Sequence, residues 1–249
     1  MKRSFGMVAL AGLLSLPVAA SATAAEIRLI CSNALHSVMV ELGPQFEKAT
    51  GHKLIVTYGS TGPLKEQIDK GAAFDLTILG PAAIDDLIKQ GKAAAATRVE
   101  VARSGMGVAI RKGAPKPDLG STDAFKRALL NAKSIAYSDT GLTGTYIKGL
   151  VQRLGIADEL KSKVVNGRGA ETVGQGKAEL GITQISEILP VAGAELAGPL
   201  PPELQSYTVF PAAVATAAQQ TDAAKDLLKF LGSPEAAKVI RSHGLEPRG

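Results

Sequence analysis

The sequence predicts an α/β protein of two lobes, each a mostly parallel sheet flanked by helices, with two crossings between the lobes. Three observations predict this fold class. Short apolar stretches alternate with amphipathic stretches at helical spacing, as βαβ units require. The alternation is interrupted near residues 99–111 and then restarts, which indicates a second unit. A section rich in Pro and Gly near residues 185–206 separates that unit from a last strand and two helices.

The first alternating run begins after residue 25. Leu35, Val38, Leu42 and Phe46 fall at helical spacing, and Gly51 ends that helix because glycine accepts the left-handed conformation of a C-cap. Gly91 closes a later helix in the same way. Strands are predicted at 26–31, 53–58 and 74–79, and helices at 35–51, 64–70 and 81–90.

The second run follows two strand-like pieces, 99–102 and 106–110, which flank Ser104-Gly105. Helices are then predicted at 122–132, 144–154 and 170–177, and strands at 134–138, 180–184 and 207–216. Thr221 and Ser233 can cap the two final helices. With crossings near Arg103 and at 185–206, lobe I would comprise 26–103 and 206–249, and lobe II 104–205.

The N-terminus predicts export. Lys2 and Arg3 precede an apolar run over 7–20, and small residues at 21–25 supply a cleavage site. This order is that of a secretory signal peptide, assigned here to 1–25, and it predicts a periplasmic protein. The alternative is a membrane anchor, for which the apolar run is shorter than the roughly 20 residues a spanning helix needs. Cys31 lies too far from the run for lipid attachment.

Composition excludes several functions. The formal charge of +5 falls to +3 when Lys2 and Arg3 are removed. Basic residues are scattered beside acidic ones and Trp is absent, so no nucleic-acid partner is expected. The single Cys31 cannot form an internal disulfide. The three histidines are too dispersed to predict a metal site, and no cofactor is expected.

Four predicted strand-to-helix corners carry small polar residues. Backbone N–H groups and the helix dipole at such corners favour anions, and open α/β sheets bind ligands at the carboxyl ends of their strands. The alternative is that each residue is only an N-cap. The corners predict a binder of a small polar ligand, and their residues are Ser32, Asn33 and Ala34; Ser60 and Thr61; Thr143 and Gly144; Asn166 and Arg168.

Several stretches resemble the periplasmic molybdate-binding proteins of ABC importers. These are the corner after the first strand, Gln45-Phe46-Glu47-Lys48, Leu64-Lys65-Glu66-Gln67-Ile68, Phe74-Asp75-Leu76, Thr143-Gly144-Thr145-Tyr146 and Phe230-Leu231-Gly232-Ser233-Pro234-Glu235. The resemblance covers essentially the whole mature chain. It implies the type II periplasmic-binding fold, a monomer that closes on molybdate, tungstate or another small anion, and a membrane permease as partner. It favours a binding protein without catalytic residues over an enzyme.

The resemblance also implies which positions bind the ligand. The family's first-corner serine falls on Ala34, where the hydroxyl is missing and Asn33 or Ser32 would substitute. The second-corner serine falls on Thr61, and two backbone donors fall on Thr143 and near Asn166. These assignments add one position, Gln184, which stands where the family has a hydrogen-bonding tyrosine.

Arg168 points to a second hypothesis. A guanidinium fork suits a planar carboxylate, although the same side chain would also pair with Glu171 in solvent. The chain is also similar to aconitate isomerase, which implies proton transfer on a di- or tricarboxylate by a nearby base. The candidate bases are Asp139, Glu171, Tyr58 and Tyr137. A third reading, the effector domain of a transcription regulator, is disfavoured by the signal peptide.

Three other features carry weaker hypotheses. His36 lies in the first turn of a helix beside the first corner and could transfer a proton. Cys31 ends a buried strand, where a small core residue is more common than a nucleophile. The stretch Gly105-Met106-Gly107 lacks the Lys-Ser/Thr of a phosphate-binding loop.

Overall fold

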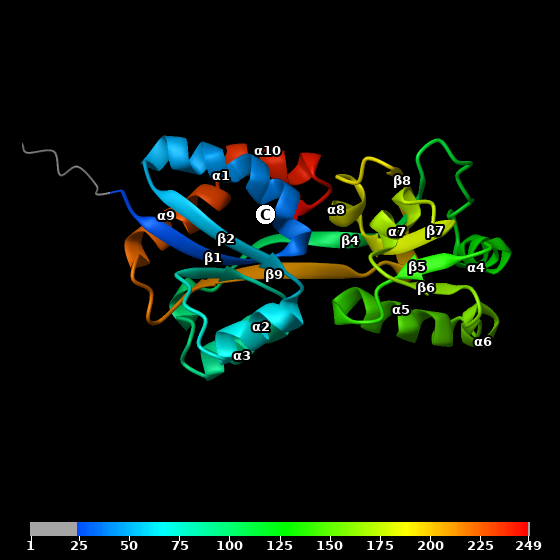
Figure 1. Cartoon of the computed structure of the whole chain (residues 1–249), viewed down its shortest axis with the longest axis horizontal. Helices are drawn as coiled ribbons and strands as arrows, with labels where there is room; N and C mark the ends of the chain where they lie inside the picture. Colours follow the sequence, from blue (N-terminus) through cyan, green and yellow to red (C-terminus); the bar gives the residue numbers. More distant parts are fainter. Residues whose placement is uncertain (1–23, 249) are drawn as a thin grey trace, which may run out of the picture.

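The computed structural model describes residues 24–248. The molecule is elongated, and its two lobes lie side by side along the long axis (Figure 1). One path of hydrogen-bonded strands runs through both lobes in the order β2-β1-β3-β9-β4-β7-β5-β6, with β8 and β10 paired to β4 off this path. The predicted two-lobed α/β class is confirmed.

The first lobe is built around parallel strands and contains both ends of the described chain. The strand β1 (Glu26–Ser32) pairs in parallel with β2 (Lys53–Gly59) and with β3 (Leu76–Ile78). The helices α1 (His36–Thr50), α9 (Thr221–Leu231) and α10 (Pro234–Ser242) lie on one side of this sheet, and α2 (Thr61–Asp69) and α3 (Pro81–Lys89) on the other (Figure 1). Apolar side chains that include Phe46, Leu29 and Phe210 fill the larger of its two cores.

The second lobe has its own parallel strands and its own core around Phe125. The strand β5 (Ile135–Tyr137) pairs in parallel with β6 (Val164–Asn166) and with β7 (Leu180–Gln184). The other elements of this lobe are α4 (Thr122–Asn131), α5 (Gly141–Arg153), α6 (Ala157–Leu160), α7 (Gly169–Gly174), α8 (Ile185–Ile188), β8 (Ala194–Pro199) and the short 3-10 helix Pro202–Leu204.

Two extended segments join the lobes (Figure 1). The strand β4 (Val99–Arg111) pairs through Gly105 with β9 (Tyr207–Val214), and from Met106 onward with β7. The return segment is held by the Gln205 side chain, which accepts from the Met106 N–H at 2.7 Å and donates to its carbonyl at 3.0 Å. Both crossings therefore meet at one place, beside Met106.

The prediction of two strand pieces flanking Ser104-Gly105 was wrong, because β4 is one strand of 13 residues. Ser104 and Gly105 pair with Thr208 and Tyr207, so the small residues continue the ladder instead of turning the chain. The section 185–206, predicted as irregular, contains α8, β8 and a 3-10 helix. The short strand β6 was not predicted, since three residues of which none is fully buried give no apolar run.

Several predicted boundaries also differ. The helix predicted from Gly144 starts at Gly141, and the one predicted to 177 ends at Gly174. The last long strand ends at Val214. In the described part of the chain no helix is both long and apolar enough to span a membrane. The predicted signal peptide falls almost wholly on residues 1–23, outside the described residues.

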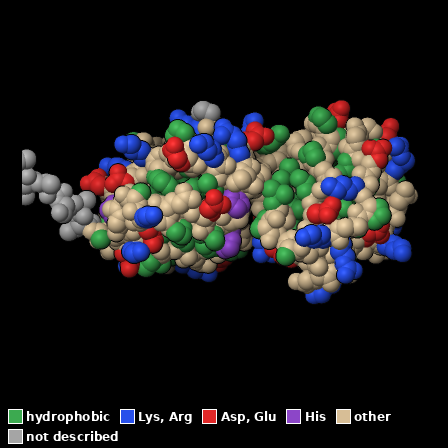
Figure 2. Space-filling model, turned by 90° about the horizontal axis from the view of Figure 1, so that it is seen from above, with side chains coloured by type: hydrophobic (Ala, Val, Ile, Leu, Met, Phe, Trp, Pro, Cys, Tyr) green, Lys and Arg blue, Asp and Glu red, His purple; other side chains and the backbone are tan. Residues whose placement is uncertain are grey.

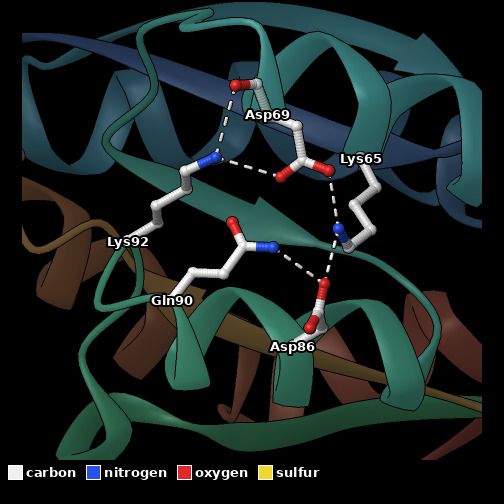
Figure 3. Close-up of polar contacts among 5 residues, drawn as sticks. All are labelled: Lys65, Asp69, Asp86, Gln90 and Lys92. Atoms are coloured by element: carbon white, nitrogen blue, oxygen red, sulfur yellow. Dashed lines mark hydrogen bonds and ion pairs between the residues drawn. The ribbon is translucent and has the colours of Figure 1, made fainter.

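Two lysines join the outer faces of α2 and α3 (Figure 3). The Lys65 Nζ atom lies 2.6 Å from a carboxylate oxygen of Asp69 and 2.6 Å from one of Asp86. Lys92 contacts the other oxygen of Asp69 at 3.0 Å, and the Gln90 amide donates to Asp86 at 2.9 Å. These contacts link α2, which begins at the second corner, to α3 and to the residues that follow it.

Candidate functional site

A cavity of about 100 Å³ is lined by residues of both lobes. It lies where several strands end and helices begin, the position at which α/β sheets bind ligands. Its lining is mainly hydroxyl and amide groups with one arginine and one glutamate. The lining residues are Ser32, Asn33, Ser60, Thr61, Ser138, Thr140, Gly141, Thr143, Arg168, Gly169, Thr183, Gln184, Glu187 and Phe210.

The first lobe contributes two corners. Ser32 ends β1, and its Oγ atom accepts from the Ala34 N–H at 3.4 Å. Ser60 is the N-cap of α2, but its side chain makes no capping hydrogen bond to a described residue. The Thr61 Oγ1 atom accepts from the Gly80 N–H at 3.2 Å, which leaves its own O–H free to donate. Both corners therefore present hydrogen-bond donors to the cavity.

The second lobe contributes the start of α5. Gly141 has φ 74°, a left-handed value that glycine adopts without strain. The Ser138 Oγ atom donates to the Thr140 carbonyl at 3.1 Å and fixes this turn. A Cβ on Gly144 would lie 2.3 Å from the Ser138 carbonyl oxygen, so Gly144 lets the helix pack directly on the turn. The turn in this way brings Thr140 and Thr143 to the cavity.

The charged part of the cavity comes from α7 and α8. Arg168, the N-cap of α7, lies 2.9 Å from Glu171 and remains more than half exposed, with 60% of its side-chain surface accessible. Glu187 on α8 accepts a hydrogen bond from the Thr183 hydroxyl. Burial raises the pKa of the Glu187 carboxyl, and the Thr183 bond and the Arg168 charge only partly offset this.

A second hollow of about 380 Å³ adjoins the cavity and shares Asn33, Arg168 and Glu187 with it. In this hollow the rings of His36 and Tyr58 meet edge to face, with centroids 4.5 Å apart. The two hollows together can take a ligand larger than a tetrahedral oxyanion. Ser37, Glu171, Ser186, Pro190 and Val191 complete the lining of the second hollow.

Seven of the ten residues predicted from the corners and the resemblance line the cavity: Ser32, Asn33, Ser60, Thr61, Thr143, Arg168 and Gln184. The other three lie beside it and support its walls. Ala34 is buried and contacts Ser32 through its N–H. Gly144 packs against the Ser138 turn. The Asn166 side chain accepts from the Asp139 N–H at 3.1 Å and so holds the same turn.

Sequence reasoning missed four polar lining residues, Ser138, Thr140, Thr183 and Glu187. Ser138 and Thr140 flank Asp139 just before the predicted third corner. A prediction that started α5 at Gly141 instead of Gly144 would have placed both residues at this strand-to-helix corner. Thr183 lies inside a predicted strand and points to the cavity. Glu187 follows that strand in a section without helical periodicity, where no pattern distinguished it from a solvated carboxylate.

The candidate bases do not all reach the site. Glu171 and Tyr58 line the second hollow, whereas Asp139 and Tyr137 line neither hollow. Burial, and to a smaller degree Cys31, raises the pKa of Tyr58 to about 12, so the phenol stays protonated near neutral pH and almost no phenolate is present to act as a base. Burial also raises the pKa of the Cys31 thiol well above its usual range, consistent with an inert core residue.

The three histidines lie in different surroundings. His52 is buried, and its Nδ1 atom accepts from the Ala25 N–H at 3.1 Å. His243 pairs with Glu41 at 2.8 Å, and neither residue lines the cavity or the second hollow. His36 alone of the three lines a hollow. Across residues 24–248 no three His, Cys, Asp or Glu side chains gather in a metal-binding cluster.

Comparison with known proteins places the geometry in context. Residues 27–246 match the family described as bacterial extracellular solute-binding protein. The chain is 34% identical over 247 residues to an aconitate isomerase of a Pseudomonas species, covering 94% of this chain and 93% of that protein. It is 30% identical to the molybdate-binding protein ModA of Azotobacter vinelandii, covering 91% and 92% of the two chains.

Solved structures share the fold. The Azotobacter vinelandii periplasmic molybdate-binding protein superposes with a TM-score of 0.76 at 21% identity, covering 90% of this chain and all (100%) of that one. The tungstate-binding protein TupA of Desulfovibrio alaskensis G20 superposes with a TM-score of 0.66 at 17% identity, covering 91% and 100%. At these identities the likeness concerns the fold.

Proposed function

The chain belongs to the bacterial extracellular solute-binding protein family, and from that premise we propose that it binds a small anion between its lobes and delivers it to an ABC importer. The observation that carries this proposal is the cavity, in which hydroxyl-bearing corners from both lobes face one another. An anion loses its hydration shell on entry, which is costly unless hydrogen-bond donors replace the water. Donors on two sides meet this requirement.

The lobes are assigned to residues 26–103 with 206–249 and to residues 104–205. The ligand enters between them, and rotation about the segments near Met106 closes them over it. The Gln205 amide, which binds both backbone groups of Met106, ties the return segment to β4 at this point. The closed form acts as a periplasmic monomer, released from a cleaved signal peptide, and docks on a membrane permease.

The surface agrees with a small-molecule role. On the face shown in Figure 2, Lys and Arg side chains are interspersed with Asp and Glu over both lobes and form no continuous basic stripe. Nucleic-acid binding proteins concentrate positive charge on one face. The charged groups that can contact a small ligand are instead those at the cavity, the side chains of Arg168 and Glu187.

A thermal-shift screen of the mature protein tests the binding role. The panel contains molybdate, tungstate, sulfate, phosphate, and di- and tricarboxylates that include both aconitates. A ligand at 100 times its dissociation constant stabilises the folded state by about 2.7 kcal/mol, a rise of several degrees in melting temperature. A clear rise with at least one anion is expected. No rise with any of them contradicts the proposed function.

A second function, isomerisation of an unsaturated tricarboxylate in the same cleft, is favoured by one observation. Glu187, a carboxyl with a raised pKa, lies at the cavity together with Arg168 and next to the larger hollow. Arg168 would hold a carboxylate of the substrate, and Glu187 or Glu171 would move the proton. The 34% identity to an aconitate isomerase supports this alternative.

Turnover separates the two functions. Purified protein is incubated with cis- or trans-aconitate without any membrane fraction, and interconversion is followed by chromatography. The isomerase function predicts interconversion that is lost in Arg168→Ala and kept in Arg241→Ala, which changes an exposed side chain on α10. A flat trace with binding intact removes isomerisation of this substrate and leaves the importer role.

A further inference from the structure

The cavity has an acceptor side as well as donors. Gln184 is only 5% exposed, and its Oε1 atom accepts no hydrogen bond from any described residue. Glu187, three residues further on, places a carboxyl at the same cavity. A buried acceptor without a donor costs free energy, so Gln184 favours a ligand that brings a proton, and the Glu187 carboxyl offers a second acceptor at the same cavity.

The surroundings of Glu187 define what it can do. The Thr183 hydroxyl donates to one of its oxygens, and a weaker contact with the Gln184 backbone also favours the ionised carboxylate. From α7, Arg168 attracts its negative charge and Glu171 repels it, and these two side chains also pair with each other at 2.9 Å. From the first lobe, His36 and Tyr58 line the hollow that Glu187 shares.

The strands that pack on α8 add no further charge that the structure pairs with Glu187. Arg103 on β4 instead contacts Glu246. On β8, Glu195 contacts Lys116. The electrostatic environment of Glu187 is therefore set by burial, by the Thr183 hydrogen bond, by the Arg168–Glu171 pair and by whichever anion occupies the cavity.

An ionised carboxylate repels a fully ionised anion, and in a partly buried site the repulsion is strong. A single proton between them removes it and converts the contact into a short charge-assisted hydrogen bond. We propose that one proton is shared between the Glu187 carboxyl and the bound anion, so that the site selects anions of weak acids, carboxylates or hydrogen phosphate, over sulfate. This inference deepens the proposed function and rests on it.

The proton balance is simple. When Glu187 and the ligand are both ionised before binding, the complex takes up one proton from the buffer. When either of them already carries the proton, no uptake occurs. For citrate, uptake should therefore rise with pH, from near zero at about pH 5 towards one proton per site at about pH 8, whereas hydrogen phosphate already carries a proton throughout this range and should bind with little uptake.

Calorimetric titration of the full-length mature protein measures this directly. Citrate, inorganic phosphate and sulfate are titrated in two buffers of different ionisation enthalpy at each pH, which gives the number of protons taken up. Citrate represents the carboxylates, and phosphate represents an anion that brings its own proton. Sulfate should bind at least about tenfold more weakly than the better of the two, because it does not hold a proton in this range.

The variant Glu187→Gln removes the shared proton and keeps an acceptor for Thr183. It should abolish proton uptake and improve sulfate binding by about tenfold, since the repulsive charge is gone. The matched control Glu203→Gln removes a charge from an exposed side chain in the 3-10 helix and should retain the wild-type proton uptake.

The outcomes separate the two proposals. If none of the anions binds, the proposed function fails and this inference fails with it. If citrate binds with no proton uptake at any pH, or if sulfate binds as tightly as the better of citrate and phosphate, the binding role stands and the shared proton is refuted. The wild-type titration alone decides this, even where Glu187→Gln does not fold.

Discussion

Glu187 distinguishes this cavity from an anion site that is lined only by neutral hydrogen-bond donors. Its carboxyl lies on a short helix beside Thr183 and Gln184, where burial raises its pKa. A carboxyl with a raised pKa resists ionisation in the folded state, while the unfolded chain ionises normally. The protein therefore loses stability at this residue in exchange for a group that can hold a proton beside an anion.

This cost is a testable property of the ligand-free protein. Below the unfolded pKa of Glu, about 4.3, both states carry the proton and the residue has no pH-dependent effect. As the pH rises, the unfolded state releases its proton first, so stability falls until the folded pKa is passed. Glu187→Gln should therefore melt higher than the wild type, by a margin that grows with pH over the acidic range above about pH 4.

Melting temperatures of Glu187→Gln, Glu203→Gln and wild type across this range check the prediction. Glu203→Gln should follow the wild type, because Glu203 is exposed. A margin for Glu187→Gln that stays constant or shrinks as the pH rises would show that the carboxyl ionises normally in the folded protein.

The hydroxyl residues at the first-lobe corners could be predicted from sequence, whereas Thr183 and Glu187 could not. Ser32, Ser60 and Thr61 interrupt clear apolar runs, so their place at the ends of strands follows from local pattern. Thr183 and Glu187 instead reach the cavity because β7 is followed directly by a helix of four residues. Nothing local marks so short a helix, because it contains about one turn.

At the scale of elements, the start of α5 shapes the second-lobe side of the site. Gly144 is needed for close approach, since a Cβ there would lie 2.3 Å from the Ser138 carbonyl. Gly149, in the same helix, has only the flexible end of Arg153 nearby, at 3.4 Å. The two glycines share a helix and differ in what surrounds them, which makes them a matched pair.

Gly149→Ala should raise the free energy of unfolding by about 0.5–1 kcal/mol, because alanine favours the helix more than glycine does. Gly144→Ala should lower it by about 1–3 kcal/mol and weaken ligand binding, because the turn that carries Ser138 must move. Chemical denaturation and binding titrations measure both. Equal effects of the two substitutions would contradict the close packing at Gly144.

The ion pairs between α2 and α3 make a second prediction at this scale (Figure 3). Hydrogen bonds from Lys65 hold the pKa of Asp69 and of Asp86 below their usual range. Groups with depressed pKa values stabilise the fold above their unfolded pKa, and this stabilisation is lost as the pH falls through the folded pKa. Lys65→Met should therefore lower the melting temperature at neutral pH, and the difference should shrink towards about pH 3.

Lys70→Met is the control for this experiment, because Lys70, the C-cap of α2, forms its one ion pair among residues 24–248 with Glu66 of the same helix, at 2.6 Å. It should have a smaller effect at neutral pH, as expected for one exposed pair. If Lys65→Met and Lys70→Met behave alike, the contact between the two helices contributes nothing beyond a surface ion pair.

Whether a helix or strand could be predicted from sequence depended on its length and on how deeply it is buried. The long helix α1 and the buried strand β1 were located by periodicity. The helix α9 was located by an expected cap at Thr221, which is wrong by one residue, because Thr221 begins the helix and Gln220 is its N-cap. The strand β4 was divided in error, because Ser104-Gly105 has the composition of a turn. Its continuity depends on pairing with β9, which is distant in sequence, and local composition does not report such pairing.

At the scale of the whole molecule, two cores are joined by strands that pass from one to the other (Figure 1). These two cores share no residue, so relative motion of the lobes can leave the packing within each of them unchanged. The cavity lies between corners that belong to different cores. Its affinity for an anion should therefore depend on both lobes at once.

The two-lobed arrangement itself could be predicted from sequence, because the α/β alternation stops and restarts. The convergence of the corners could be inferred only in part. Asn166 and Gly144 share the pattern of the lining residues, yet they support the Ser138 turn instead of facing the cavity. The difference between lining and supporting depends on the packing of α5 and α7, which no sequence pattern specifies.

The most direct test of this account is the affinity of the best-binding anion for Thr61→Ala, Thr143→Ala and the double variant, with Thr145→Ala as control. Thr61 and Thr143 line the cavity from opposite lobes, whereas the Thr145 hydroxyl donates to the Gly141 carbonyl at 3.0 Å. Each lining variant should weaken binding by about 1 kcal/mol or more, roughly fivefold, with Thr145→Ala unchanged. Unchanged affinity in both lining variants would show that the anion binds elsewhere.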